Sequence, residues 1–517
     1  MRNSIKLKSK FLSLIFSLTI LANSQNIRNY HLLKVGLHFD SKVSGGKYTM
    51  AELAGFANSY GLDAAIITDH DNMKVTYGIS PFTKFLKFSI QENSIANYGV
   101  EKYLQEILQT NQVYSNIVFI PGVEAVPYYF WQGSPLYSNL ILKNWHTHLL
   151  VFGLPNVEAY KQLPSLANRG LGYQKPEGEL MQYIAEHFSY FSLIALYLIL
   201  FLISIFSIIR RSRRRRDIAH ITHRRHRYHF SWKALLFTLL FGYILYSEYP
   251  FLPLKYDQYH GNPGSGPFQE LINYVNANQG MIFWAHPEVA HTEMRPLKIP
   301  LLKQTIKIET EAYPKMITET KDYTGFCIFW EGMKTVGLPG GLWDIVLDEY
   351  CTGIRKKPVW AIGELDFEES NELTEVSATN TFVFTTEKSQ NAILEAIRSG
   401  RMYTTRNHFG DQVILEDFSV YDPHTNRSAF IGETLLMPRP PVEIHVKIRS
   451  LEVNPRPTTV FLYRNTELIK TFPLQNQVDD YYLDQEPFTN SMNYYRILVG
   501  SRDFQSLATN PVFVKRY

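Results

Sequence analysis

Short, nearly continuous apolar runs alternate with amphipathic segments along most of the chain. Runs that are apolar on both faces are typical of strands in a parallel sheet that is covered by helices. The helical segments carry their own signals, since Thr49 and Glu52 form a capping box and Gly61 stands at a helix stop. The pattern therefore predicts an α/β fold, either a barrel or an open parallel sheet. The predicted strands are 30–39, 63–71, 116–125, 147–154, 281–288 and 358–369, and the predicted helices are 49–61, 267–280 and 341–350.

The pattern changes from about residue 411 to the end of the chain. Four segments, 442–450, 458–465, 494–501 and 510–517, alternate apolar and polar residues and are separated by turn residues. Strict alternation is typical of strands with one buried face, and helical periodicity is scarce here. The sequence therefore predicts a β-sandwich-like domain over 411–517.

The N-terminal segment has the composition of a secretory signal peptide. A basic stretch with Arg2 and three lysines precedes an apolar run, and Ala22 and Ser24 occupy the −3 and −1 positions of a possible cleavage site. The sequence predicts a signal peptide over 1–24, with an uncleaved signal anchor as the alternative. Either one places the residues that follow outside the cytoplasm.

Two further apolar segments are long enough to cross a membrane. Segment 188–209 has no charged residue, and a helix of this length spans about 30 Å of hydrocarbon. Segment 234–254 is weaker, because Glu248 and Pro250 interrupt it near one end. Together they predict a transmembrane hairpin inserted into the α/β domain. The two predicted parts of that domain are 25–187 and 255–410.

The segment between the two predicted spans, 210–233, is rich in arginine and histidine. Its residues 210–229 hold nine Arg and one Asp, a charge of about +8, so the positive-inside rule predicts that the segment is cytoplasmic. Arginine runs also bind the phosphates of nucleic acids. Between two spans, however, a role in topology and in contact with anionic lipid is the simpler interpretation. The whole chain carries +4, so the rest of it is acidic, and we predict no nucleic-acid partner.

The two cysteines, Cys327 and Cys351, leave two interpretations open. They could form a disulfide in an oxidising compartment, or remain as buried free thiols.

Side chains that can bind metal stand at the ends of six predicted strands whose bodies are almost wholly apolar. In α/β folds the loops at the carboxyl ends of parallel strands converge on the functional site. A single histidine at such a place is most often structural, but independent chance would have scattered Ser, Thr, Asn and Lys over these ends. The shared choice of His, Asp and Glu predicts a metal site. The residues are His38, Asp40, Asp69, His70, Glu124, His146, His148, His286, Asp366 and Glu368.

This set and its order resemble the PHP superfamily, named for polymerase and histidinol phosphatase domains. LHFD (37–40) is similar to the H-x-H motif of the family, TDHD (68–71) to its T-D-H motif and PGVEA (121–125) to its G-x-E motif. HTHLLVFGL (146–154), WAHPE (284–288) and AIGELDFEE (361–369) are similar to the motifs that follow. The resemblance covers about 30–517 apart from the hairpin. It implies a distorted seven-stranded TIM-like barrel, followed by the β domain of an extracytoplasmic branch of these metallohydrolases.

Carried over position by position, the resemblance implies a phosphoesterase with a set of eight metal ligands. Asp69 would orient histidine tautomers, and with His70 and His286 it would form the catalytic group. His146 is an extra candidate, because it would share a strand face with His148. The implied ligands are His38, Asp40, His70, Glu124, His148, His286, Asp366 and Glu368.

Three positions depart from the family pattern. Asp40 and Glu368 stand where histidines are expected, and Gly45 stands where a carboxylate is expected. Oxygen donors shift the preference from Zn toward Mn, Fe or Mg. We therefore predict two divalent ions, of Mn, Fe, Zn or Mg, in an active site. A catalytically degenerate membrane protein that binds metal or another ligand is the alternative.

The predicted reaction is hydrolysis of a phosphomonoester or phosphodiester, envelope-derived in view of the anchor, by a metal-activated water. No G-x-S-x-G motif and no P-loop in the sequence competes with this prediction. Lys74 and Arg401 could contact phosphate, although solvated surface positions are the simpler interpretation. Tyr481 and Tyr482 could bind glycans, but we interpret them as core or interface residues.

Overall fold

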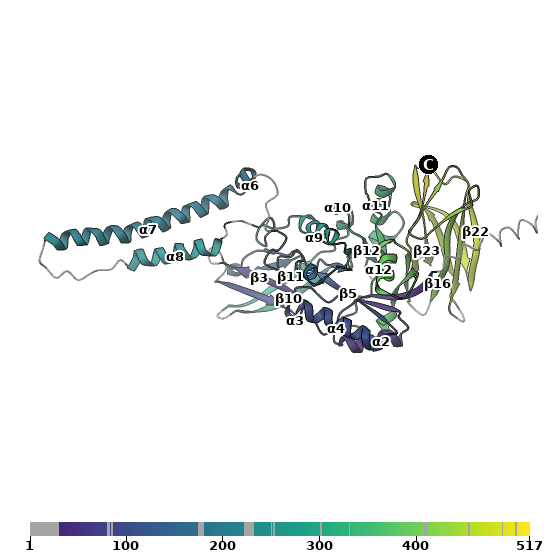
Figure 1. The fold of residues 1–517 in the computed structure, drawn as a ribbon, viewed down its shortest axis with the longest axis horizontal. Helices are drawn as coiled ribbons and strands as arrows, with labels where there is room; N and C mark the ends of the chain where they lie inside the picture. Colours follow the sequence, from purple (N-terminus) through teal and green to yellow (C-terminus); the bar gives the residue numbers. More distant parts are fainter. Residues whose placement is uncertain are drawn as a thin grey trace, which may run out of the picture.

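The computed structural model is that of an elongated, mixed α/β protein (Figure 1). The predicted signal peptide lies outside the described residues, as do 222–231 of the predicted arginine-rich segment. The described residues are 30–79, 83, 86–173, 180–221, 232–249, 251, 254–299, 302–329, 331–407, 412–452, 455–488, 490–501 and 504–517.

Seven strands of the largest sheet form the predicted α/β half of the molecule. Their spatial order is β13-β12-β9-β8-β5-β2-β1, and neighbouring strands are parallel except for β8, which is antiparallel to β5 and β9. The expectation of a wholly parallel sheet is therefore wrong for β8, whose first residues reach the edge where the other strands end. The strands are β1 (His31–Phe39), β2 (Ala64–Ile67), β5 (Val118–Ala125), β8 (Leu149–Phe152), β9 (Met281–Trp284), β12 (Gly325–Ile328) and β13 (Trp360–Gly363).

The described strands form an open path and not the closed barrel that was expected. The reason is β14 (Thr379–Thr385), which pairs with the first half of β1, from His31 to Val35, and occupies that edge. The chain that follows β13 can therefore meet β1 only beyond Val35. It does so through the Leu365 N–H, which donates to the Leu37 carbonyl at 3.0 Å, and the Phe367 N–H, which donates to the His38 carbonyl at 2.9 Å.

Helices pack on this half of the sheet, and its apolar side chains form one buried core. The predicted capping box of α2 (Met50–Ser59) is present, with Thr49 and Glu52 bonded reciprocally. Cys327 in β12 and Cys351 at the end of α11 are buried free thiols, so the disulfide interpretation is not supported. The other helices of this half are α3 (Ile95–Tyr98), α4 (Val100–Val113), α5 (Val157–Lys161), α9 (Gly266–Ala277), α10 (Met316–Glu319), α11 (Leu342–Cys351) and α12 (Gln390–Arg398).

Three two-stranded ribbons, which the sequence analysis missed, extend from the edge that carries the predicted ligands. Each follows a strand of the sheet: β3–β4 follows β2, β6–β7 follows β5, and β10–β11 follows β9. β7 pairs with β11, so two of the ribbons form one four-stranded sheet. Their strands are β3 (Lys74–Gly78), β4 (Lys87–Gln91), β6 (Phe130–Gln132), β7 (Ile141–Lys143), β10 (His291–Ile299) and β11 (Leu302–Thr310).

The C-terminal strands form the predicted β-sandwich-like region, at the yellow end of the chain in Figure 1. The sheet β17-β16-β19-β22 and the outer part of the large sheet enclose a second apolar core. β15 pairs with β24, so the large sheet is continuous between the two regions. The strands are β15 (Met402–Arg406), β16 (Val413–Asp422), β17 (Arg427–Phe430), β18 (Thr434–Met437), β19 (Val442–Ser450), β20 (Thr458–Arg464), β21 (Glu467–Leu474), β22 (Gln477–Asp484), β23 (Met492–Gly500), β24 (Gln505–Thr509) and β25 (Val512–Arg516).

After α6 (Leu180–Glu186), two long helices project from the body as a hairpin (Figure 1). α7 (Phe188–Ile221) contains one described segment that is long and apolar enough to cross a membrane, Phe188–Ile209. α8 (Trp232–Glu248) has 17 residues and ends before Pro250, so the predicted second span over 234–254 is too long. Residues 210–221 continue α7 and are not the loop that was expected. The helices contact each other through the Ser204 and Thr238 hydroxyls, 2.8 Å apart.

Candidate metal centre

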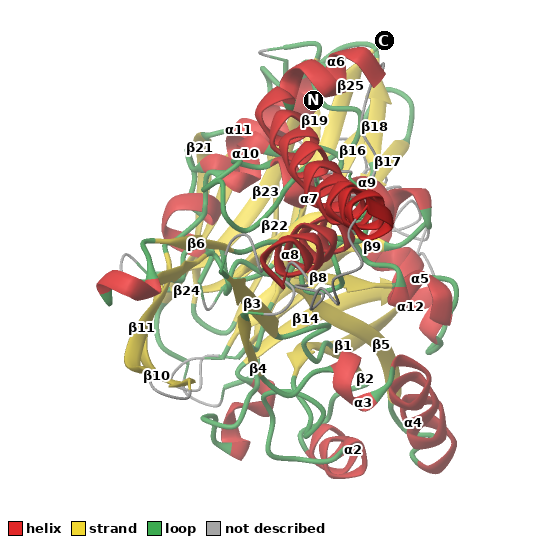
Figure 2. Cartoon of the chain, turned by 90° about the vertical axis from the view of Figure 1, so that its left-hand side faces the viewer, coloured by secondary structure: helices red, strands yellow, loops and turns green. Residues whose placement is uncertain are grey.

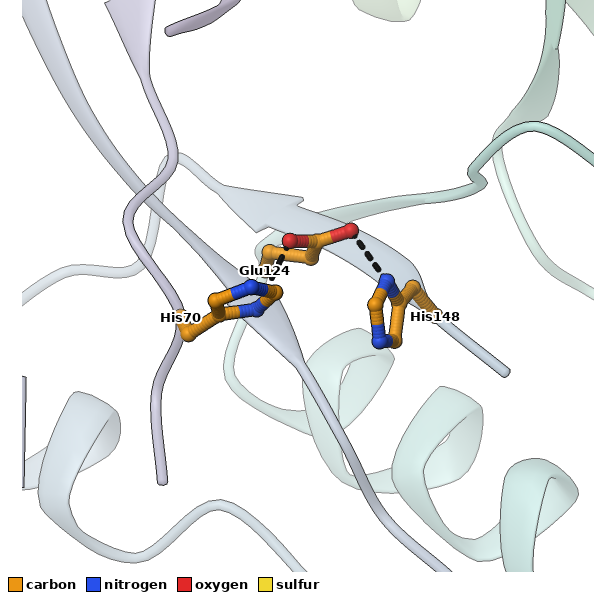
Figure 3. Close-up of side chains that lie close together, drawn as sticks. All are labelled: His70, Glu124 and His148. Carbon is orange, nitrogen blue, oxygen red and sulfur yellow. Dashed lines mark ion pairs between the residues drawn. The ribbon is translucent and has the colours of Figure 1, made fainter. Parts of the chain in front are cut away.

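Glu124 is the centre of a cluster of four histidines. It lies near the end of β5 and is 2% exposed. His70, which follows β2, and His148, which precedes β8, lie on either side of it (Figure 3), with Nδ1 atoms 2.8 and 2.5 Å from its oxygens. His38 in β1 and His286 after β9 place their Nε2 atoms 3.4 and 3.5 Å from it. Five side chains that are far apart in the sequence therefore meet at one edge of the sheet.

These atoms are close to one another without forming well-aligned hydrogen bonds. Buried polar atoms nearly always have partners, and those that bind one ion point toward a common position between them. The donor set of imidazoles and carboxylates therefore fits divalent metal ions. Within the described part of the chain, the buried atoms of the cluster without a hydrogen-bond partner are His38 Nε2, Asp40 Oδ1, His70 Nδ1, Glu124 Oε1, both ring nitrogens of His148, and His286 Nδ1.

Two overlapping groups of side chains could each hold an ion. His70, Glu124 and His148 form one group, and His38, Asp40 and Glu124 form the other, with ligand atoms within 4.8 Å of one another in each group. Glu124 belongs to both, and a carboxylate has two oxygens. Glu124 could therefore contribute a ligand atom to an ion in either group.

Glu364 belongs to this site, and the sequence analysis missed it. It follows β13 directly and is fully buried. Its Oε1 lies 2.7 Å from His38 Nδ1, and its Oε2 accepts a hydrogen bond from the His286 backbone N–H at 2.9 Å. A carboxylate on Nδ1 fixes the ring and leaves Nε2 for an ion. The sequence did contain a signal for Glu364, which is an acidic residue directly after an apolar strand. The resemblance to the family motif instead led us to predict Asp366 and Glu368.

The turn after β1 is shaped around two carboxylates. Asp69 accepts hydrogen bonds from the Ser41 N–H at 2.9 Å and from the Ser44 hydroxyl at 2.6 Å. It therefore holds this turn, and its described hydrogen bonds do not include the expected one to a histidine. Asp40, 5% exposed, lies in the same turn, and a Cβ on Gly45 would lie 2.7 Å from its Oδ2. Gly45, at the position where the resemblance implied a carboxylate, therefore leaves room for Asp40.

Three residues of the site have a backbone conformation that side chains rarely adopt. The φ angles of His38, His286 and Asp366 are 72°, 24° and 50°. The pairing of β1 with β2 shifts register between Leu37 and Phe39, so His38 occupies a bulge that redirects its side chain. Each such residue costs about 1–3 kcal/mol, and strain of this kind concentrates at functional sites.

The cluster carries coupled charges. Burial alone would raise the pKa of Glu124, but His148, His70 and His38 hold it well below its usual range. Burial opposes protonation of His70, yet Glu124 raises the pKa of that ring to about 10. Burial and nearby carboxylates raise the pKa of Asp40 well above its usual range, although His70 opposes them. Without an ion, the site therefore holds anionic Glu124 beside protonated imidazole, and a cation must displace protons to bind.

Two predicted ligands, Asp366 and Glu368, and the extra candidate, His146, have surroundings that differ from those of the five clustered side chains. Asp366 Oδ1 lies 3.6 Å from His38 Nδ1, and its side chain is 30% exposed. Glu368 is exposed and accepts a hydrogen bond from the Ser370 hydroxyl at 2.9 Å, outside the cluster, because β13 ends at Gly363 and Glu364 takes the place beside the strand ends. The His146 ring lies 4.1 Å from that of His291 and 5.6 Å from that of His148.

The candidate residues for phosphate contact and glycan binding lie in three different parts of the structure. Arg401 lies over Tyr30 at 5.6 Å, before the start of β1, at the opposite end from the cluster. Lys74 is the first residue of β3. Tyr482 packs against the core of the C-terminal region, as we expected for it, whereas Tyr481 is 49% exposed and stacks on His445.

No known family profile and no curated protein matches this chain. Solved structures similar to it include a two-domain protein from Bacteroides vulgatus containing a predicted PHP-like metal-dependent phosphoesterase, with 11% identity, a TM-score of 0.33, and coverage of 94% of this chain and 96% of that chain. An inferred metal-dependent phosphoesterase from Bifidobacterium adolescentis has 15% identity and a TM-score of 0.24, covering 64% and 87%. An amidohydrolase from Chromobacterium violaceum has 12% identity and a TM-score of 0.24, covering 65% and 88%. Likenesses at these TM-scores carry no inference about the fold or activity of this chain.

Proposed function

We propose that this chain is a metal-dependent hydrolase of phosphate esters, anchored in a membrane with its site outside the cytoplasm. The observation that carries the proposal is the convergence of four histidines on buried Glu124, with ring nitrogens that find no hydrogen-bond partner among the described residues. Each unsatisfied buried polar group costs about 1–3 kcal/mol, so such a set is expected where a ligand satisfies it. The order of the motifs, similar to that of the PHP superfamily, supports phosphate esters as the substrate class.

Two divalent ions are the proposed cofactors. His70, Glu124 and His148 would hold one ion, and His38, Asp40 and Glu124 the other. Bound there, the ions would supply Lewis acidity and a water that ionises near neutral pH. The imidazoles favour Mn, Fe or Zn over Mg.

The remaining residues of the site position these groups or move protons. Glu364 holds the His38 ring by its Nδ1, and Asp69 holds the turn that carries Asp40. Asp366 is the part of the site with a partly exposed carboxyl, 30% accessible. We assign to it the proton transfer to the leaving group, because a general acid must reach both substrate and solvent.

The proposed anchor is α7, and the chain returns across the membrane along α8. The apolar segment of α7 is only 6% buried in the protein. The Lys255 N–H, after α8, donates to the Tyr173 carbonyl, before α6, at 2.8 Å. Both ends of the hairpin are therefore fixed to the same body. The arginines of 210–221 would lie in the cytoplasm, and the two parts of the site together outside it.

We also propose that the seven strands form a distorted barrel that closes only at the site end. The backbone bonds from 365–367 to the end of β1 support this closure. Because closure is confined to that end, Glu364 and Asp366 are brought beside His38.

The test is metal analysis and hydrolysis by the purified full chain in detergent. With Mn supplied, we expect bound metal and hydrolysis of p-nitrophenyl phosphate or bis-p-nitrophenyl phosphate. His70→Ala should lose both properties. His260→Ala is the matched control, because that side chain is 87% exposed.

Two other outcomes are informative. Bound metal without hydrolysis of either ester would favour the catalytically degenerate, metal-binding protein. Protein that holds no metal, with no hydrolysis and no change on His70→Ala, would overturn the proposal.

A further inference from the structure

The site end of the large sheet faces the helical hairpin, and its opposite end faces the C-terminal β region. Tyr30, just before β1, lies 6.3 Å from Phe430, and Trp360, at the start of β13, lies 6.1 Å from Phe513. His38 is at the other end of β1. In Figure 1 the α/β half accordingly lies between the β region and the hairpin.

The chain that leaves the hairpin is bound to the ribbons at the rim of the site. The Trp131 N–H of β6 donates to the Gln258 carbonyl at 2.8 Å, and the Gly78 N–H of β3 donates to the Tyr259 hydroxyl at 2.8 Å. Between the end of α8 at Glu248 and Lys255, the chain can span at most about 25 Å. The rim is therefore tethered close to the end of α8. Figure 2 shows β3, β4, β10 and β11 on the face from which the hairpin emerges.

This rim exposes apolar side chains in front of packed aromatic rings. Ile79 and Leu86 are 42% and 44% exposed, and the Ile79 N–H donates to the Leu86 carbonyl at 2.8 Å, so they lie side by side at the end of the β3–β4 ribbon. Met294 on β10 is 62% exposed. Behind the ribbon end, Tyr77 lies 5.5 Å from Trp131. The exposed groups are therefore held on a packed surface.

We propose that this rim rests in the headgroup layer of the membrane that α7 spans, and that the substrate is a phosphate ester carried by a membrane lipid. The choice of substrate rests on the proposed hydrolase activity, whereas the contact with the membrane rests only on the proposed anchor, α7. We assign the bilayer as the partner of the rim for two reasons. Leu202 and Phe206 of α7 are 54% and 60% exposed and need an apolar surrounding. The short connection after α8 holds the rim beside the same bilayer. A lipid phosphate stands at that interface and reaches the site without leaving the membrane.

The contact with the membrane can be tested by site-specific labelling. Both native cysteines are buried, so an environment-sensitive dye can be placed on Leu86→Cys, with Leu468→Cys in β21, 46% exposed, as the matched control. The full chain is reconstituted in phosphatidylcholine–phosphatidylglycerol vesicles that contain a spin-labelled quencher lipid. We expect quenching at position 86 to be several times that at position 468. Equal quenching at the two positions would overturn the proposal.

The substrate class is tested with two phosphomonoesters, one carried in a membrane and one in solution. The Mn-loaded full chain is assayed on phosphatidic acid in vesicles and on soluble p-nitrophenyl phosphate. The double variant Ile79→Ser, Leu86→Ser should lower the rate on vesicles about tenfold and leave the soluble rate unchanged. Equal loss on both substrates, or no loss on vesicles, would contradict it. If the protein hydrolyses neither ester, the proposed function fails, and the quenching experiment still decides the membrane contact.

Discussion

Two clusters of buried charge in this molecule are each centred on a carboxylate but are built in opposite ways. At the junction of α11 and β23, the Asp344 carboxylate accepts hydrogen bonds from Arg496 at 2.8 Å, from the Tyr494 hydroxyl at 2.7 Å and from the Gly340 N–H at 2.6 Å. Around Glu124, four imidazoles approach one carboxylate, but several of the atoms involved have no hydrogen-bond partner in the described structure. In the first cluster both carboxylate oxygens have partners within the protein, whereas the second is expected to be complete only with a ligand.

This difference separates a buried charge that stabilises the fold from a buried charge that serves a functional site. Arg496 is fully buried and forms an ion pair with Asp344, so removing Asp344 leaves an uncompensated buried charge. His38 and His70, whose pKa values Glu124 raises, can release their protons and become neutral when the carboxylate is removed. Loss of Glu124 should therefore reduce function more than stability, and loss of Asp344 should do the reverse.

The largest expected effect is that of Glu124→Gln on activity. We expect a fall of about a thousandfold or more, about 4 kcal/mol in transition-state stabilisation, because Glu124 belongs to both candidate metal groups. Metal content should fall in parallel, whereas the free energy of unfolding of the metal-free protein at pH 8 should change by no more than about 1–2 kcal/mol. Elemental analysis, kinetics and thermal unfolding measure the three quantities. A Glu124→Gln variant that retains its metal would contradict the proposed difference between the two clusters.

Asp344→Ala should show the opposite profile. We expect a loss of about 3–5 kcal/mol in the free energy of unfolding, because buried Arg496 loses its partner. The protein that remains folded should bind metal like the wild type. Denaturant titration measures the first and metal content per folded chain the second. In the variant Asp344→Ala, Arg496→Met, much of the loss should be recovered; an additive loss would show that the two side chains do not act as a pair.

Glu364→Gln should have an intermediate effect. Glu364 acts on the ions through His38 and His286, so we expect metal affinity to fall by about 10–100-fold with the fold intact. Competition with a chelator of known affinity measures this change. Glu368→Gln is the matched control, because Glu368 is exposed and lies outside the cluster. A larger effect of Glu368→Gln would restore the original ligand prediction.

The smallest effect is expected at a third, partly exposed cluster. Burial lowers the pKa of His445, but hydrogen bonds to Asp417 and Asp479 raise it above the usual value. A group with a raised pKa in the folded state stabilises fully below its unfolded pKa of about 6.5, and that contribution is lost as the pH rises through the folded pKa. The free energy of unfolding of the wild type, measured by denaturant titration, should therefore exceed that of His445→Gln most at pH 6, by about 1 kcal/mol or less. A difference that grew with pH would contradict this.

Much of the sheet could be predicted because most strands appear in the sequence as short apolar runs. The runs before His38, His70, Glu124 and His286 were predicted as strands, and each contains or overlaps a strand of the structure. The direction of β8 could not be predicted in this way, since an apolar run reads the same in both directions and only its neighbours decide the pairing. Glu364 was missed for a related reason. Which acid after β13 faces the cluster depends on where the strand ends and on the strained backbone at Asp366.

The sequence by itself determined the residue types at the strand ends, the apolar α7 segment and the capped helix at Thr49, because these depend on neighbours along the chain. Only the tertiary structure decided that Glu124 lies at the centre of the cluster, that Glu364 contacts His38 whereas Glu368 lies outside the cluster, and that the cluster faces the hairpin. These facts depend on distances between residues that are far apart in the chain. Such distances are set by strand order, by β14 occupying the first half of β1, and by the bond between Lys255 and Tyr173.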